Sequence, residues 1–233
     1  MRTRRSALRI ALLLAAAGAG CRHAAIPPAP LPDDWRSLVH EPAAFAALYR
    51  LSVGSARDLV LTVRSGGDRV SLTVAVPPGG VALAVWISGD EGWLGRIKER
   101  CREPLPPGVI PLPKNGSLPL DARLAALLLS GSVPGGAREV GDAPGWVEAA
   151  TGGVVWRARI GGPPAACSRV VVTRANGASL FTAELGSQVG QVPGTIVLEA
   201  GSERAELALK EWHPSETPPP PAWLSTPACG ELR

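Results

Sequence analysis

Few residues of this chain are of the types that most often carry chemistry. It has 3 histidines and 4 cysteines in 233 residues. The spacing of His23, His40 and His213 suggests no pair of metal ligands. The sequence contains no GxSxG, HExxH, P-loop, GxGxxG or CxxC motif. It therefore predicts a protein that is not an enzyme and that holds no metal ion and no dissociable cofactor.

The N-terminus is typical of a secretory signal peptide. Arginines at positions 2, 4, 5 and 9 precede an apolar run from Ile10 to Ala19. That run falls far short of the ~20 residues that a membrane-spanning helix needs. Small residues and then Cys21 follow it. We therefore expect residues 1–20 to be a signal peptide that is removed on export.

The tetrad Gly18-Ala19-Gly20-Cys21 resembles the lipobox of bacterial lipoproteins, with Gly18 where leucine is usual. The resemblance implies cleavage before Cys21, a diacylglycerol on its sulfur and an acyl group on its amine. Arg22 follows, rather than the aspartate that signals inner-membrane retention. By analogy we expect a lipid anchor at the periplasmic face of the outer membrane. The alternative is an ordinary signal peptide followed by a chance cysteine.

The net charge depends on the signal peptide. The whole chain has 24 basic and 20 acidic residues, a formal net charge of +4. Residues 1–20 hold four arginines and no acidic residue, so 20 residues of each sign remain in the mature chain. A neutral chain lacks the basic surface that nucleic acid binding needs, and we expect no nucleic acid partner.

The elements that position these residues follow from apolar periodicity. Residues 21–32 are rich in proline and predict an extended tether. Helical spacing predicts a broken amphipathic helix over 34–50, on the pattern of Trp35, Leu38, Val39, Phe45, Leu48 and Tyr49. Asp33 or Asp34 is expected to cap this helix, which explains the pair better than a metal site does.

From Arg57 the period changes to two, which is the pattern of β-strands. Val70, Leu72, Val74 and Val76 are predicted to share one buried face, with Ser71 and Thr73 on the other. Short turns separate four such strands up to Arg100, and this predicts an antiparallel meander. The six prolines of residues 102–119 argue against a central strand there.

A second helix is expected over 121–130, capped by Asp121 and ended by Gly131. Six more strands are predicted over 145–150, 154–160, 168–174, 179–185, 194–200 and 204–211. Residues 214–233 contain the run Pro218–Pro221 and suggest an extended tail. The sum is a mainly β fold with some α, in which a long antiparallel sheet of about ten strands curls around a core.

The segment Leu127-Leu128-Leu129-Ser130-Gly131-Ser132-Val133-Pro134 resembles the LLxGxLP segment after the mid-chain helix of LolB-like proteins. The element order over residues 34–212 is also similar to the LolA/LolB superfamily. This resemblance implies a half-open barrel over residues 33–213, covered by an N-terminal and a mid-chain helix. It also implies a protein that accepts or carries acyl chains of lipoproteins or other lipids. One departure is the tip from Ser88 to Gly92, which is small and acidic where the family's outer-membrane receptor exposes a large apolar residue.

The resemblance also selects candidates for the lining of an apolar cavity. They are Leu124, Leu127 and Leu128 of the mid-chain helix, with Trp86 and Trp156 of the strands. Ordinary core packing is the alternative for all five. The rival function is a structural or adaptor lipoprotein with a packed barrel, whose Pro-rich tail recruits a periplasmic protein partner. A continuous apolar cavity would favour the carrier, and a solid core would favour the adaptor.

Three cysteines remain besides Cys21. The cell envelope permits disulfides, and Cys101, Cys167 and Cys229 allow at most one bridge. The sequence does not select the pair. A bridge from Cys229 would hold the tail on the barrel.

The substitution Cys21→Ala tests the lipobox. It should abolish acylation, because no other thiol follows the small residues of the signal peptide. Metabolic labelling with a fatty acid analogue measures this directly. Fractionation alone is a poor test, since the uncleaved apolar segment can also retain the precursor at the membrane. Label in the variant would refute the lipobox.

Overall fold

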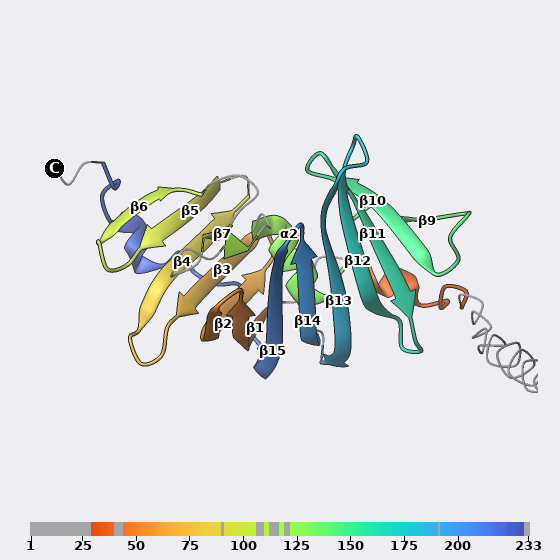
Figure 1. Ribbon diagram of the computed structural model, residues 1–233, viewed down its shortest axis with the longest axis horizontal. Helices are drawn as coiled ribbons and strands as arrows, with labels where there is room; N and C mark the ends of the chain where they lie inside the picture. The colour runs from red at the N-terminus through yellow and green to blue at the C-terminus, as the bar shows by residue number, and fades with distance from the viewer. Residues whose placement is uncertain are drawn as a thin grey trace, which may run out of the picture.

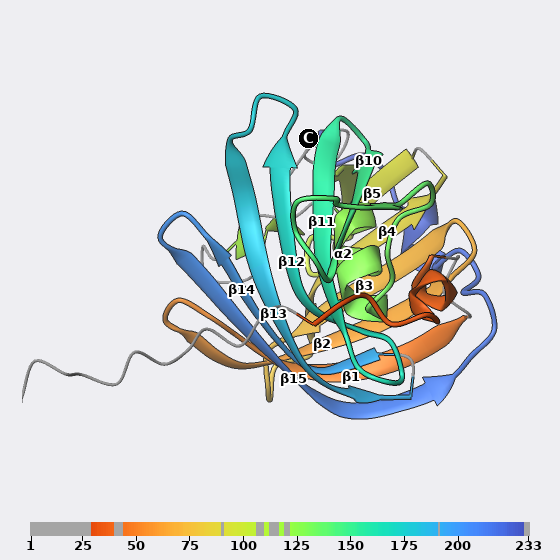
Figure 2. The same cartoon turned by 90° about the vertical axis from the view of Figure 1, so that its right-hand side faces the viewer.

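The computed structural model describes residues 29–39, 44–89, 91–105, 110–111, 117–118, 122–190 and 192–230. The signal peptide, Cys21, His23, His40 and Asp121 lie outside these ranges. The described chain is one curved sheet around a single α-helix, α2 (Ala122–Ser130) (Figures 1 and 2). None of its helices has the length and hydropathy of a membrane span.

Thirteen antiparallel strands form the sheet, in the order β6-β5-β4-β3-β2-β1-β15-β14-β13-β12-β11-β10-β9. The first meander is β1 (Phe45–Val53), β2 (Ala56–Gly66), β3 (Arg69–Ala75), β4 (Val81–Ser88), β5 (Glu91–Arg96) and β6 (Cys101–Pro104). The second is β9 (Arg138–Glu139), β10 (Trp146–Thr151), β11 (Val154–Gly161), β12 (Ala166–Arg174), β13 (Ser179–Val189), β14 (Val192–Ala200) and β15 (Glu203–Pro214). Because β6 and β9 do not pair with each other, the barrel is open. A separate pair, β7 (Ile110–Pro111) and β8 (Ser117–Leu118), lies outside the sheet order.

The predicted helix over 34–50 is wrong for most of its length. Among the described residues of this span only the 3-10 turn η1 (Trp35–Leu38) is helical, and Phe45–Val53 is the strand β1. Phe45 and Tyr49 are four residues apart, which fits both one helical turn and two strand repeats. Alternation through Ala47, Leu51 and Val53 decides for the strand, since all three are buried.

The predicted cap at Asp34 is also wrong. Asp34 makes no side-chain cap on η1. Its Oδ2 instead accepts a hydrogen bond of 3.1 Å from the backbone N–H of Ala165, between β11 and β12. The carboxylate therefore holds the N-terminal segment against the second meander.

The sheet has three strands beyond the ten expected, and the described residues contain one α-helix where two were expected. The additional strands are β1, β6 and β9. Two of them, β6 and β9, are short edge strands, and an edge tolerates proline because one side needs no ladder hydrogen bond. The other predicted strands occur within a few residues of their expected bounds, and Leu72 and Val74 are buried as predicted. Val76 lies just beyond β3 and is half-buried.

The C-terminal segment folds back on the sheet instead of forming a free extended tail. The Ser215 N–H donates to the carbonyl of Ala44 at 3.0 Å. Further along, the ring of Trp223 in η3 (Ala222–Ser225) lies so close to Gly95 that a Cβ there would meet it at 2.8 Å. A disulfide then joins Cys229 to Cys101 of β6, with Cα atoms 4.8 Å apart. Figure 1 shows η3 beside β5 and β6.

Replacing Cys229 by serine should destabilise the fold by several kcal/mol. The disulfide closes a loop of 128 residues, and the chain-entropy model assigns ~4–5 kcal/mol to a loop of that size. Denaturant unfolding of the two proteins measures the difference. A reducing agent should bring the parent protein down to the level of Cys229→Ser and leave the variant unchanged. Equal unfolding midpoints for oxidised parent and variant would contradict this prediction.

Candidate functional site

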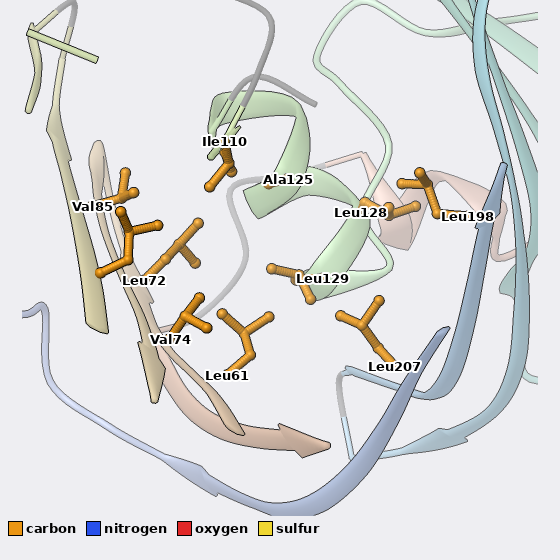
Figure 3. A pocket seen from close by; sticks show the side chains of 11 residues that line it. Leu61, Leu72, Val74, Val85, Ile110, Ala125, Leu128, Leu129, Leu198 and Leu207 are labelled. Carbon is orange, nitrogen blue, oxygen red and sulfur yellow. The ribbon is translucent and has the colours of Figure 1, made fainter. Parts of the chain in front are cut away.

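A small apolar cavity lies between α2 and the concave face of the sheet (Figure 3). Strands of both meanders supply its walls, and Figure 3 shows the side chains of β2–β4 on one side of α2 and those of β14 and β15 on the other. Every described residue that lines it is apolar: Leu61, Leu72, Val74, Leu83, Val85, Ile110, Ala125, Leu128, Leu129, Leu198 and Leu207. Such a cavity offers no hydrogen bond to water and suits hydrocarbon.

Helical spacing brings the apolar residues of α2 to this cavity. Ala125 and Leu129 are four residues apart, so they lie on one face with Leu128 beside them. Gly131, with φ of +65°, ends the helix. The Ser132 N–H donates to Leu127 O at 3.1 Å and the Gly131 N–H to Leu128 O at 3.2 Å, which is a Schellman motif. The segment that resembles LLxGxLP is therefore the helix C-terminus.

The volume of the cavity is about 20 Å³. This is room for roughly one water molecule, and a lipid acyl chain is many times larger. The described side chains therefore nearly fill the space between α2 and the sheet. An acyl chain can enter only if α2 or the wall opposite it moves.

The structure places the five candidate lining residues in different surroundings. Leu128 lines the cavity. Leu124 is buried in the same core, and Leu127 is half-buried at its margin, but neither is among the lining residues. Trp86 and Trp156 do not line the cavity either.

Trp86 belongs to the convex face of the sheet. It lies opposite Ser71 and Trp93 in register, whereas Val85, its neighbour in the chain, lines the cavity. Trp86 is nevertheless only 4% exposed. The C-terminal segment begins its path beside Gly66, where Thr217 lies next to the strand. It then reaches Gly95, which the ring of Trp223 covers. This path crosses the part of the convex face that carries Trp86.

Trp156 lies on the concave face of β11 and is fully buried. Its ring meets Phe181 edge to face, with centroids 6.4 Å apart and planes at 80°. The Nε1 atom of Trp156 has no hydrogen-bond partner in the described part of the chain. Its contacts are those of a packed core residue.

Most of the cavity wall follows from rows of alternating strand residues, and Leu72 and Val74 belong to a row that the sequence predicts. Ile110 is different, because its proline-rich surroundings give no periodic signal. Leu198 and Leu207 come from β14 and β15, more than 65 residues beyond the end of α2 in the chain. Their place beside α2 depends on the pairing of β15 with β1.

The described residues show little polar chemistry. They contain no group of three or more His, Cys, Asp or Glu side chains that could hold a metal ion. Burial raises the pKa of the Cys167 thiol to about 12, so this free cysteine stays protonated at neutral pH. The described residues that line the cavity offer apolar contacts and include no acid, base or nucleophile.

Two solved structures share this fold. A domain described as an outer membrane lipoprotein-sorting protein domain from Vibrio parahaemolyticus superposes with a TM-score of 0.54 at 11% identity, over 76% of this chain and 88% of that one. A LolA superfamily protein from Nitrosomonas europaea superposes with a TM-score of 0.53 at 13% identity, over 79% and 92%. The chain matches no protein-family model and no curated protein. The expected LolA/LolB-like domain is thereby confirmed as a fold.

Replacing Leu128 by alanine should cost more stability than replacing Leu127. Leu128 is 2% exposed and lines the cavity, so its loss enlarges a void, and we expect ~3 kcal/mol of destabilisation. Leu127 is half-buried, so Leu127→Ala should lower the free energy of unfolding by roughly half as much or less. Denaturant unfolding of both variants measures the difference. Equal losses of unfolding free energy in the two variants would mean that α2 does not pack as described.

Proposed function

We propose that this protein is an envelope lipoprotein that accepts or carries acyl chains between α2 and the concave face of the sheet. In this proposal the N-acylated and S-diacylglycerol-modified Cys21 anchors it at the periplasmic face of the outer membrane. The observation that carries the proposal is the wholly apolar contact between one helix and a concave sheet. The two similar structures support it, since both belong to lipoprotein-sorting or LolA-type proteins.

Binding needs no covalent step. Each methylene group moved from water into an apolar site contributes ~0.8 kcal/mol. The contacts of Ala125, Leu128 and Leu129 with the cavity wall are apolar and have no directional requirement. An acyl chain can therefore replace them with contacts of the same kind when α2 moves away.

The anchor would keep the domain close to the membrane. The described chain begins at Ala29, and a Cβ on Gly145 at the start of β10 would meet the carbonyl of Ala29 at 2.8 Å. Seven residues, and so eight Cα–Cα steps, separate Ala29 from Cys21, which allows a reach of at most about 29 Å. This distance suits an exchange of acyl chains with the bilayer or with a protein at its surface.

A second candidate is the adaptor, and the small cavity favours it, because 20 Å³ is close to a solid core. Its docking element would be Pro218–Pro221. Pro219 and Pro220 are exposed, and Pro221 has φ of −71° and ψ of 147°, the polyproline II conformation. Such a segment fits an aromatic-lined groove on a periplasmic partner.

The deciding experiment is native mass spectrometry of the protein extracted from its own membrane. A retained lipid, beyond the covalent anchor, is the result expected of a carrier. The complementary measurement is titration of the purified protein with a fluorescent fatty acid. Saturable binding supports the carrier. If no lipid is retained and no fatty acid binds, the adaptor becomes the favoured function.

Ala125→Leu should weaken binding of the fluorescent fatty acid by about tenfold or more. The added carbon atoms occupy the cavity and displace methylene groups of the ligand, each worth ~0.8 kcal/mol. Ala126→Leu is the matched control, because Ala126 is the next residue of α2 and does not line the cavity. Circular dichroism must show both variants folded, since overpacking also destabilises. The same affinity for both variants would place binding elsewhere.

A further inference from the structure

The tip of the β13–β14 hairpin meets the C-terminal end of α2. We define the hairpin tip as residues 186–190 and 192–194. A side chain at Gly131, just past α2, would meet Gln188 Nε2 at 3.4 Å and the ring of Pro193 at 3.6 Å. Gln188 and Pro193 pair across the hairpin. The end of α2 therefore lies beside this tip, some 60 residues further along the chain.

Tyr49 fixes the tip from inside the core. Its hydroxyl donates a hydrogen bond of 3.2 Å to the carbonyl of Pro193, and the side chain is fully buried. In the β1–β15 ladder Leu48 pairs with Glu211 and Tyr49 with Leu209, so the register shifts beside Tyr49 and Lys210 of β15 has no partner in β1. Tyr49 also lies directly opposite Leu61, a residue of the cavity wall. One phenol thus connects the wall of the cavity to the hairpin that touches α2.

A second contact holds the tip from the side of β15. Gly190 has φ of +62°, and a Cβ there would meet the ring of Trp212 at 2.7 Å. Only glycine allows this approach. Val192 is fully buried, whereas Val189 is 48% exposed. The tip is therefore pinned on its inner side and open to solvent on its outer side.

We propose that the hairpin tip is a latch on α2, and that Tyr49 is the positioning residue that keeps the latch closed. The inference rests on the proposed function, since it concerns how the same cavity opens. With the latch in place, Pro193 and Gln188 block outward movement of the end of α2. When the bond from Tyr49 to Pro193 breaks, the tip can swing toward solvent and the end of α2 is released.

Burial supports a constant role for this bond. It raises the pKa of the Tyr49 phenol well above its ordinary value, so the hydroxyl remains a donor throughout the physiological pH range. The latch is therefore opened by competition for contacts rather than by pH. An incoming acyl chain has no hydrogen-bonding group along its length, so it competes for the apolar contacts of the tip, such as the Pro193 ring beside Gly131.

The test is Tyr49→Phe, which removes the hydroxyl and keeps the ring. Hydrogen exchange followed by NMR should show about fivefold faster exchange at Ser132 and Val133, whose N–H groups bond to Leu127 O and Leu38 O. Fivefold is the factor that corresponds to the ~1 kcal/mol net worth of a buried hydrogen bond. The association rate of the fluorescent fatty acid should rise by a similar factor.

Val172→Ala is the matched control. Val172 is fully buried on the same face but in register with Phe181, at the end of β13 away from the tip. It should lower the denaturation midpoint without selective exchange at the end of α2. If Tyr49→Phe does not fold, Trp212→Leu removes the contact with Gly190 and should show the same selective exchange.

The outcomes separate the latch from the proposed function. If Ser132 and Val133 exchange no faster in Tyr49→Phe than in Val172→Ala, at matched stability, the latch is refuted. If the parent protein binds no fatty acid, the carrier function fails, and the exchange measurement still decides whether the tip holds α2. Selective exchange with unchanged association would also overturn the proposal, because the latch would then not control entry.

Discussion

The fold depends on the pairing of β1 with β15. Every other neighbouring pair of strands in the large sheet is also consecutive in the chain, so each meander could exist as a separate sheet. The ladder from Phe45↔Pro214 to Val53↔Ala205 joins them into one curved surface. Only the joined sheet has a concave face wide enough to enclose α2 from both sides. The cavity, the register shift beside Tyr49 and the approach of the hairpin tip to α2 all follow from this one ladder.

A closed apolar interface has two energetic consequences. It stabilises the empty protein, because the apolar residues of α2 cover the concave face that would otherwise meet water. It also sets a cost for any ligand, which must replace these contacts before it gains its own. A carrier built in this way binds acyl chains only as strongly as the difference between the two sets of contacts. Such a difference suits a protein that must also release what it binds.

Much of the sheet could be predicted from the sequence, because alternation over seven or more residues has one physical meaning. Leu72 and Val74 are examples. The prediction failed at Phe45–Val53, where apolar residues four apart fit a helix and a strand alike. The strand is decided by the alternation that continues through Ala47, Leu51 and Val53, and the pairing with β2 and β15 fixes it. For the site, Leu128 was predicted and Ile110 was not. Trp86 shows what strand periodicity cannot predict. Alternation places Trp86 and Val85 on opposite faces of the sheet, but which of the two faces becomes concave depends on the whole sheet. The pairing of Cys101 with Cys229 likewise needed the fold.

The same disulfide constrains the order of events during folding. Cys101 must wait for 128 further residues before its partner exists, and β1 must wait for β15, which ends at Pro214. Until then the inner edge of the first meander has no neighbour, and such an edge can pair with another chain. Contacts between residues so far apart are also formed slowly. The two meanders therefore stay unjoined until β15 and Cys229 have been made, and these complete both the hydrogen bonding of the sheet and the covalent closure of the fold.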